Sequence, residues 1–165
     1  MVLWVIRAGS RGEYEEEAMR ECRIAIGFGV DLEDVSGMTD REEVKRAYSR
    51  SNPGMLQGRI NTCGGQVYRF VNDVRIGDAV VLPLKTREAV MMGTVKGCCM
   101  FEEAPEFRHW RPVEWAARWD GGPIPIGEFG PAMRKEFDRR LTLSKIGDGR
   151  VEAGMLRIAG ITARS

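Results

Sequence analysis

The chain has few of the residues and motifs on which familiar catalytic and metal sites depend. It has one histidine, His109, in 165 residues, and its four cysteines include no C-x-x-C pair. A structural zinc site is therefore not expected, because such sites need four cysteine or histidine ligands at set spacings. The phosphate-loop pattern G-x-x-x-x-G-K-[ST] and the nucleophile pattern G-x-S-x-G are both absent. We expect no metal, no cofactor and no catalytic activity in this chain.

Long apolar runs are also missing. No segment approaches the roughly 20 apolar residues of a membrane helix. The start, Met1-Val2-Leu3-Trp4, lacks the basic flank of a signal peptide and is typical of a first strand. We therefore expect a cytoplasmic protein with no membrane partner, and the length suits one domain.

Charge is unevenly distributed, although the formal net charge is only +1. Five glutamates between residues 13 and 21 form an acidic patch, and from Pro131 onward eight basic residues accompany four acidic ones. The simpler interpretation is a pair of solvated helix faces. The alternative is a basic strip that follows a phosphate backbone. That strip would consist of Arg134, Lys135, Arg139 and Arg140.

The apolar patterns predict an α+β fold. Strands are predicted over 2–7, 23–27, 79–83, 89–96, 98–101, 110–119 and 141–146. Helices are predicted over 10–21, from 39 to about 50, after Gly64-Gly65, and over 132–140, the first two starting at the capping-box patterns 10–13 and 39–42. The strands are too many and too irregularly spaced for a doubly wound sheet. We expect a curved mixed sheet or open β-barrel with helices packed outside it.

Domain boundaries follow from the same patterns. Residues 1–147 are predicted to form the folded domain. From Gly147 the pattern weakens, and 148–165 is predicted to be a linker or the start of a following segment.

Two aromatic residues stand in unusual settings. Phe28 lies between Gly27 and Gly29, and glycine allows the backbone to bend or a ligand to approach closely. Phe107 lies in the polar loop 102–108. Exposed loop aromatics indicate a binding surface. Aromatic side chains are more often buried, and this is the interpretation we favour for Trp115 and Trp119.

Several short motifs, taken in order, resemble the EVE and YTH domains of the PUA-like superfamily. Val5-Ile6-Arg7-Ala8-Gly9-Ser10, a helix and Ile26-Gly27-Phe28 resemble their opening strand, helix and aromatic residue. Residues 67–78, ending in Ile76-Gly77-Asp78, resemble their helix–(V/I)GD turn, which two strands follow. Pro112-Val113-Glu114-Trp115 resembles a later strand. The likeness covers about residues 2–146 and is closest to the EVE-like modules of modification-dependent restriction endonucleases.

The resemblance implies a PUA-like fold and a non-catalytic reader of a modified base in DNA, methylated adenine or cytosine, flipped into an aromatic pocket. It implies the specificity module of a restriction system, whose nuclease or NTPase effector would be another domain or subunit. Phe28 stands where tryptophan is usual, and Ala8-Gly9 replace polar base-binding residues of YTH domains, so the base is not identified. Alternatives are an RNA-binding PUA-like module for a modified nucleotide, an enzyme acting on a nucleotide, and a protein-binding domain.

Residue by residue, the resemblance implies a pocket with Phe28 as one wall and Phe107, or Phe101, as the other. The remaining pocket residues would be Arg7, Ala8, Gly9, Gly27, Gly29, Asp31 and Tyr68. The flanking phosphates would be held by Arg11, Arg69 and Arg108, together with the basic strip.

Overall fold

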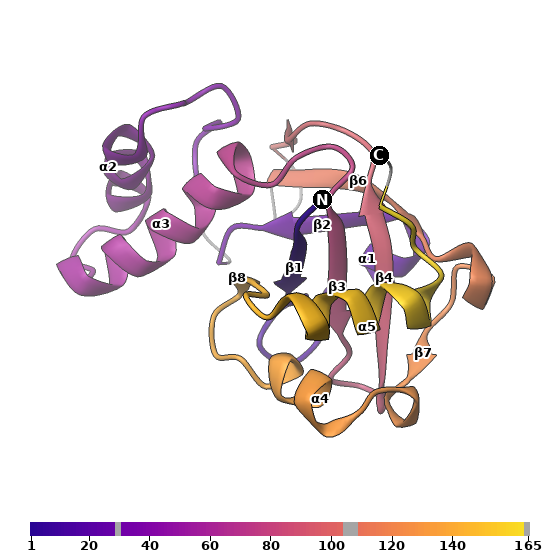
Figure 1. The fold of residues 1–165 in the computed structure, drawn as a ribbon. Coiled ribbons are helices and arrows are strands. Elements are labelled where there is room, and N and C mark those ends of the chain that lie inside the picture. Colours follow the sequence, from indigo (N-terminus) through magenta and orange to yellow (C-terminus); the bar gives the residue numbers. More distant parts are fainter. Residues whose placement is uncertain (29–30, 104–108, 164–165) are drawn as a thin grey trace.

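A computed structural model describes residues 1–28, 31–103 and 109–163 (Figure 1). Within them the fold is α+β, with a curled mixed sheet that forms a half-barrel and helices packed against it. The strands are β1 (Leu3–Ile6), β2 (Arg23–Ile26), β3 (Ala79–Pro83), β4 (Ala89–Val95), β5 (Met100–Phe101), β6 (His109–Trp115), β7 (Ile124–Pro125) and β8 (Leu143–Lys145). The helices are α1 (Glu15–Arg20), α2 (Arg41–Ser51), α3 (Gln57–Asn72), α4 (Pro131–Phe137) and α5 (Gly149–Ala159), with 3₁₀ turns η1 (Ala117–Trp119) and η2 (Ile126–Glu128).

The sheet has the order β2-β6-β4-β3-β1-β8, with β5 added to β6 and β7 to β4. Strands β1 and β3 pair in parallel, with Trp4 opposite Val80, and the other described pairs are antiparallel. The first strand therefore lies beside the strand from Val80, as the order of strand, helix and Gly-Asp turn that the chain shares with the PUA-like domains predicts. Parallel strands need a long crossover, and the whole segment from α1 to α3 supplies it.

Three buried clusters hold the fold together. The first lies inside the curl of the sheet and includes Trp4, Phe70 of α3 and Trp115 of β6. The second lies on the outer face, under α4 and α5, and includes Phe129 and Phe137. The third joins α2 to the side of α3 that runs from Ile60 to Val71. Strands β1 and β3 contribute to both the first and the second cluster, which explains why every residue of these strands is buried.

The Ile76-Gly77-Asp78 turn fastens the start of β1. The buried Asp78 carboxylate accepts hydrogen bonds from the Val2 amide at 2.9 Å and from Trp4 Nε1 at 3.0 Å. It also accepts the Arg75 amide at 3.0 Å. A buried carboxylate is tolerated because donors surround it, so this turn fixes the register of β1 against β3.

Three helix starts differ from the sequence prediction. Helix α1 begins at Glu15, because the Glu13 carboxylate binds the Arg11 amide and Ser10 Oγ in a turn and caps no helix. Helix α2 is capped by Asp40, which accepts from the amides of residues 42 and 43. Helix α3 begins at Gln57 and runs through the glycines at 64 and 65. Packing against α2 outweighs the low helix propensity of glycine there.

The segment after Gly147 is not the predicted linker. Residues Gly149–Ala159 form α5, whose Val151, Met155 and Ala159 are buried in the second cluster. Asp148 caps this helix through the Arg150 and Val151 amides, and Gly160 ends it with a φ of +70°. The helix is amphipathic but short, so its few apolar positions do not separate it, in the sequence alone, from a polar linker. In the described ranges, no helix is both long and apolar enough to cross a membrane.

Two expectations about buried residues had different outcomes. Trp115 was predicted to be core, and it is 6% exposed with its Nε1 donating to the Ala18 carbonyl. Glu15, assigned to a solvated acidic face, is instead 1% exposed. Its carboxylate accepts hydrogen bonds from the Lys85 and Thr86 amides and the Thr86 hydroxyl, and so ties α1 to the β3–β4 turn.

Candidate functional site

Phe28 lies at the junction of the sheet and the helical hairpin α2–α3. It follows β2 with a φ of +56°, a left-handed backbone that few residues other than glycine adopt. Its ring packs edge-on against Tyr48 of α2, with ring centroids 6.0 Å apart and an interplanar angle of 81°. The side chain is only partly buried, and it contacts both the first and the third cluster. An aromatic ring is thus held in a strained, partly open position.

Cys99 shares this junction. It is partly buried and, like Phe28, packs against both the first and the third cluster. Burial raises the pKa of the Cys99 thiol to about 12, which outweighs the opposing effect of the Arg111 guanidinium. The thiol is therefore neutral at physiological pH and behaves as an apolar surface.

Phe101 packs on a buried histidine beside the same region. Its ring lies 5.0 Å from that of His109, the residue opposite it in the β5–β6 ladder. His109 is 0% exposed, and its Nε2 accepts the Val35 amide at 3.0 Å. His109 thereby anchors the segment between β2 and α2 at Val35. The pairing of β5 with β6 places Phe101 against the histidine ring.

Arg111 connects this edge to α3. Its guanidinium is buried and donates to the carbonyls of Phe70 at 2.9 Å, Val71 at 2.7 Å and Gly97 at 3.0 Å. Burial lowers the pKa of Arg111. The C-terminal carbonyls of α3 carry partial negative charge, which stabilises a cation at this end. The end of α3 is thereby held against β6.

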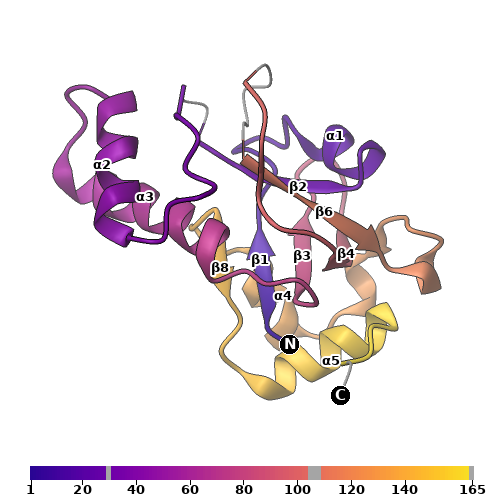
Figure 2. The ribbon, with the colours of Figure 1, turned by 90° about the horizontal axis from the view of Figure 1, so that it is seen from above.

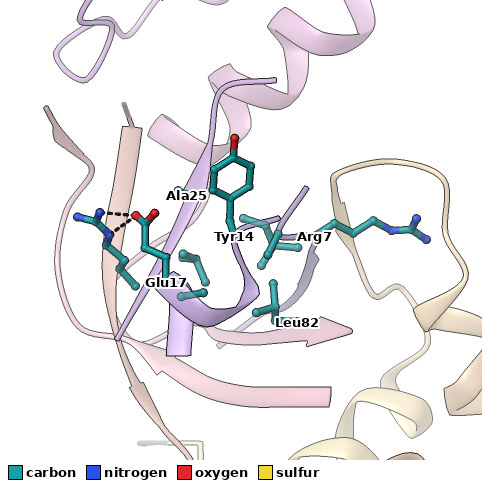
Figure 3. Close-up of a pocket in the computed structure, with 10 residues that line it drawn as sticks. Arg7, Tyr14, Glu17, Ala25 and Leu82 are labelled. Carbon is teal, nitrogen blue, oxygen red and sulfur yellow. Dashed lines mark hydrogen bonds and ion pairs between the residues drawn. The ribbon is translucent and has the colours of Figure 1, made fainter. Parts of the chain in front are cut away.

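The end of β1 is more enclosed than the sequence indicated. A cavity with only about 20 Å³ of accessible space lies between β1, β2 and α1, and Ala8 and Tyr14 line it (Figure 3). Tyr14 stands beside Ala25, whereas the Arg7 side chain points away from the cavity and donates to the Phe137 carbonyl at 3.2 Å. The Arg7 amide already donates to the Thr142 carbonyl. Arg7 therefore borders the cavity, while its guanidinium joins the end of β1 to α4.

Ala8 and Gly9 form a tight turn after β1. The Ala8 carbonyl accepts the Tyr14 amide, and Gly9 has a φ of +87°. A Cβ at Gly9 would overlap the Glu13 carboxylate and crowd the Tyr14 ring. The turn therefore requires glycine at position 9, independently of any ligand.

The other predicted pocket residues are spread more widely. Gly27 is buried behind Phe28, and Asp31 is exposed. Tyr68 lies on α3, with the Arg41 guanidinium 5.1 Å from its ring centroid. Gly29, Phe107 and Arg108 lie outside the described residues.

The residues 4–143 match the family model of a domain of unknown function, DUF8426. The chain belongs to the DUF8426 family. No curated protein and no solved structure matches it. The matched segment of DUF8426 contains β1 to the start of β8 and every candidate residue above, whereas α5 lies beyond it.

The predicted phosphate-binding residues of this DUF8426 chain that the structure describes lie on separate elements. Arg11 is exposed near α1, and Arg69 of α3 forms a 4.0 Å ion pair with Asp73. The strip from residue 134 to 140 belongs to the α4 layer, and two of its members already have partners. Arg134 donates to the Phe129 carbonyl, and Arg139 donates to the Lys145 carbonyl and pairs with Glu136. Lys135 and Arg140 are exposed.

Three residues at the candidate site were missed from the sequence. Tyr48 contacts Phe28, and Cys99 packs against the same two clusters as Phe28. Both contacts form only because the α2–α3 hairpin folds against the sheet, and no local sequence pattern predicts that. Tyr14 was assigned to a helix that begins later. Its position next to the Gly9 turn was a usable signal, because an aromatic residue beside a glycine turn often borders a binding surface.

Proposed function

We propose that this chain is a non-catalytic reader of a modified base in DNA, methylated adenine or cytosine, which it flips onto an aromatic surface built around Phe28. We assign it a PUA-like fold of the EVE/YTH type. In this proposal it works in the cytoplasm as the specificity module of a modification-dependent restriction system. A nuclease or NTPase effector in another domain or subunit would act on the DNA.

The conformation of Phe28 carries the proposal. A left-handed backbone costs a residue with a Cβ roughly 1 to 2 kcal/mol. Fully buried phenylalanines such as Phe70 and Phe129, which are 0% and 1% exposed, need no such conformation. Strain that is retained at a partly open aromatic residue is typical of a binding site. The curled mixed sheet with its parallel β1–β3 pair supports the PUA-like assignment.

The energetics favour this use of the ring. Unstacking a base costs a few kcal/mol, and stacking on an aromatic side chain returns about 1 to 3 kcal/mol. A methyl group that enters apolar surroundings adds roughly 0.8 kcal/mol. The neutral Cys99 thiol and the Tyr48 ring provide apolar surroundings next to Phe28. A methylated base would therefore be favoured over an unmodified one.

A binding panel tests the proposal. One duplex sequence carries N6-methyladenine, 5-methylcytosine, 5-hydroxymethylcytosine or no modification, and the matching RNA is included. We expect one modified duplex to bind at least about fivefold more tightly than the plain duplex, since 1 kcal/mol corresponds to about that factor. Equal affinity for all duplexes would reject the proposal, and tighter binding of RNA would favour an RNA-binding module.

A further inference from the structure

The hairpin α2–α3 stands away from the sheet and carries a one-sided charge. Figures 1 and 2 show it projecting from one side of the half-barrel. The hairpin, residues 41–72, contains six of the chain's 25 basic residues and two of its 24 acidic ones, Glu42 and Glu43, so the rest of the chain has 19 basic against 22 acidic residues. The hairpin is therefore the cationic part of a protein whose remainder is slightly acidic. The basic residues are Arg41, Lys45, Arg46, Arg50, Arg59 and Arg69.

Arg41 lies over the Tyr68 ring at 5.1 Å, and two of the other five basic residues make no ion pair within the part of the chain that the structure describes. Lys45 pairs with Glu42 at 3.3 Å, Arg50 with Glu33 at 2.7 Å and Arg69 with Asp73 at 4.0 Å. Arg46 on α2 and Arg59 on α3 are both exposed. The two remain available for an external anion.

The outer face of α3 is open to a close approach. Gly64 is explained by packing, because a Cβ there would come within 3.2 Å of the Lys45 Cα. Gly58 and Gly65 have nothing within 4 Å of such a Cβ. They lie seven residues apart and so share one helix face with Thr62 and Arg69. Each of these glycines destabilises the helix relative to alanine, and the described structure gives no packing reason for either.

The tip of the hairpin is apolar as well as exposed. Leu56, which precedes α3, is 81% exposed. An open hollow of about 390 Å³ lies beside it, lined by residues 52–56 and Arg59. A large apolar side chain next to an unpaired arginine suits a ligand with both an anionic and an apolar surface, such as the phosphates and sugars of a nucleic-acid strand.

We propose that the α2–α3 hairpin binds the sugar–phosphate backbone of nucleic acid. The glycine face of α3 lies against the strand, Arg46 and Arg59 bind phosphates, and Leu56 contacts sugars at the tip. Only the choice of nucleic acid as the ligand rests on the proposed function. In this proposal the hairpin, and not the strip from residue 134 to 140, makes the main electrostatic contact with the phosphates.

The first test measures the binding of a plain, unmodified duplex by fluorescence anisotropy over a series of salt concentrations. The double variant Arg46→Ala, Arg59→Ala should flatten the plot of log affinity against log salt by about 1.8, because each lost phosphate contact removes about 0.9. Arg157→Ala is the matched control, because Arg157 is an exposed arginine on α5, which covers the opposite face of the sheet. An unchanged slope in the double variant, or no binding by the parent at low salt, overturns the proposal.

The second test separates binding from folding. Gly65→Ala should raise the melting temperature by about 1 to 4 °C, since alanine favours the helix. The same change should weaken plain-duplex binding at least about fivefold, because the added methyl holds the strand away from the helix. A more stable variant with unchanged affinity would show that nothing approaches this face.

Two further measurements distinguish this proposal from its alternatives. Losses at the hairpin should affect plain and modified duplexes equally, whereas a defect in base recognition changes the modified-to-plain ratio. Equal affinity for modified and plain DNA would reject the proposed function and leave the hairpin proposal standing. An unchanged salt slope in the hairpin variant would reject the hairpin proposal and leave the proposed function standing. Poly-glutamate serves as a competitor, and displacement of DNA by equal charge concentrations of poly-glutamate would identify the hairpin as a site for an acidic protein.

Discussion

Replacing Phe28 in three ways tests the candidate site directly. Phe28→Ala and Phe28→Gly both remove the ring, but only glycine relieves the left-handed backbone, whose φ is +56°. The glycine variant should therefore be more stable than the alanine variant by about 1 kcal/mol. Because the side chain is partly buried, Phe28→Ala should lose less stability than the roughly 3 to 5 kcal/mol of a fully buried phenylalanine. Chemical denaturation measures both differences.

Binding should change differently from stability. If the ring stacks on a flipped base, both variants lose about 1 to 3 kcal/mol of binding to the modified duplex, roughly five- to 150-fold. The loss should be smaller for plain DNA, whose binding depends mainly on phosphates. Phe28→Trp should keep or improve the affinity, because a larger aromatic face stacks better.

A purely structural Phe28 predicts another pattern. Phe28→Trp would then overpack the junction at a cost of about 1 to 3 kcal/mol of stability, and no Phe28 variant would change the modified-to-plain affinity ratio. Anisotropy titrations with modified and plain duplexes give the deciding ratio. Reduced stability with an unchanged modified-to-plain ratio in both the alanine and the glycine variants would refute the reasoning.

Three other predictions concern residues around the site. Trp115→Ala should cost about 3 to 5 kcal/mol, and a variant that melts like the parent would contradict its burial. Arg111→Met leaves three carbonyls without their donor and should cost at least about 3 kcal/mol by denaturation, and a smaller loss would show that water replaces the guanidinium. In a Cys98→Ser background at pH 8, Cys99 should react with iodoacetamide at least about a hundredfold more slowly than the exposed Cys22, because its pKa is raised to about 12 and the thiolate is the reactive form. Its rate should rise with pH towards 12, and equal rates at pH 8 would show that the thiol is open to solvent.

The sheet could be predicted from the sequence because its signals are local. Apolar runs with turn residues between them located β1, β3 and β4 to within a residue or two. The pairing of β1 with β3 was predicted from the order of strand, helix and Gly-Asp turn in the family resemblance, and the structure explains it through Asp78, which binds the start of β1. Trp115 was expected to be core because aromatic side chains are usually buried, and in the structure it continues the alternation of buried positions in β6.

The errors arose where distant contacts override local preference. The glycines at 64 and 65 have low helix propensity, so the helix was predicted to begin after them. In the structure α3 runs through both, because α2 packs so closely against α3 that a Cβ at Gly64 would collide with Lys45. Glu15 was assigned to solvent, but the β3–β4 turn supplies three donors that only the folded chain brings to it. The neighbours of Phe28 could not be predicted for the same reason, since Tyr48 reaches it from a hairpin 20 residues away.

The two proposals meet in helix α3, whose sides have different attachments. One side of α3 faces the sheet, because Phe70 lies in the first cluster and Gln66 accepts the β8 amide of Leu143 at 2.9 Å. Another side packs against α2 from Ile60 to Val71, and Tyr48 of α2 touches Phe28. A Cβ at Gly58 or Gly65 would meet nothing within 4 Å, so these glycines lie on neither attached side. Gly65→Ala should therefore weaken backbone binding without altering the preference for a modified base that Phe28 provides.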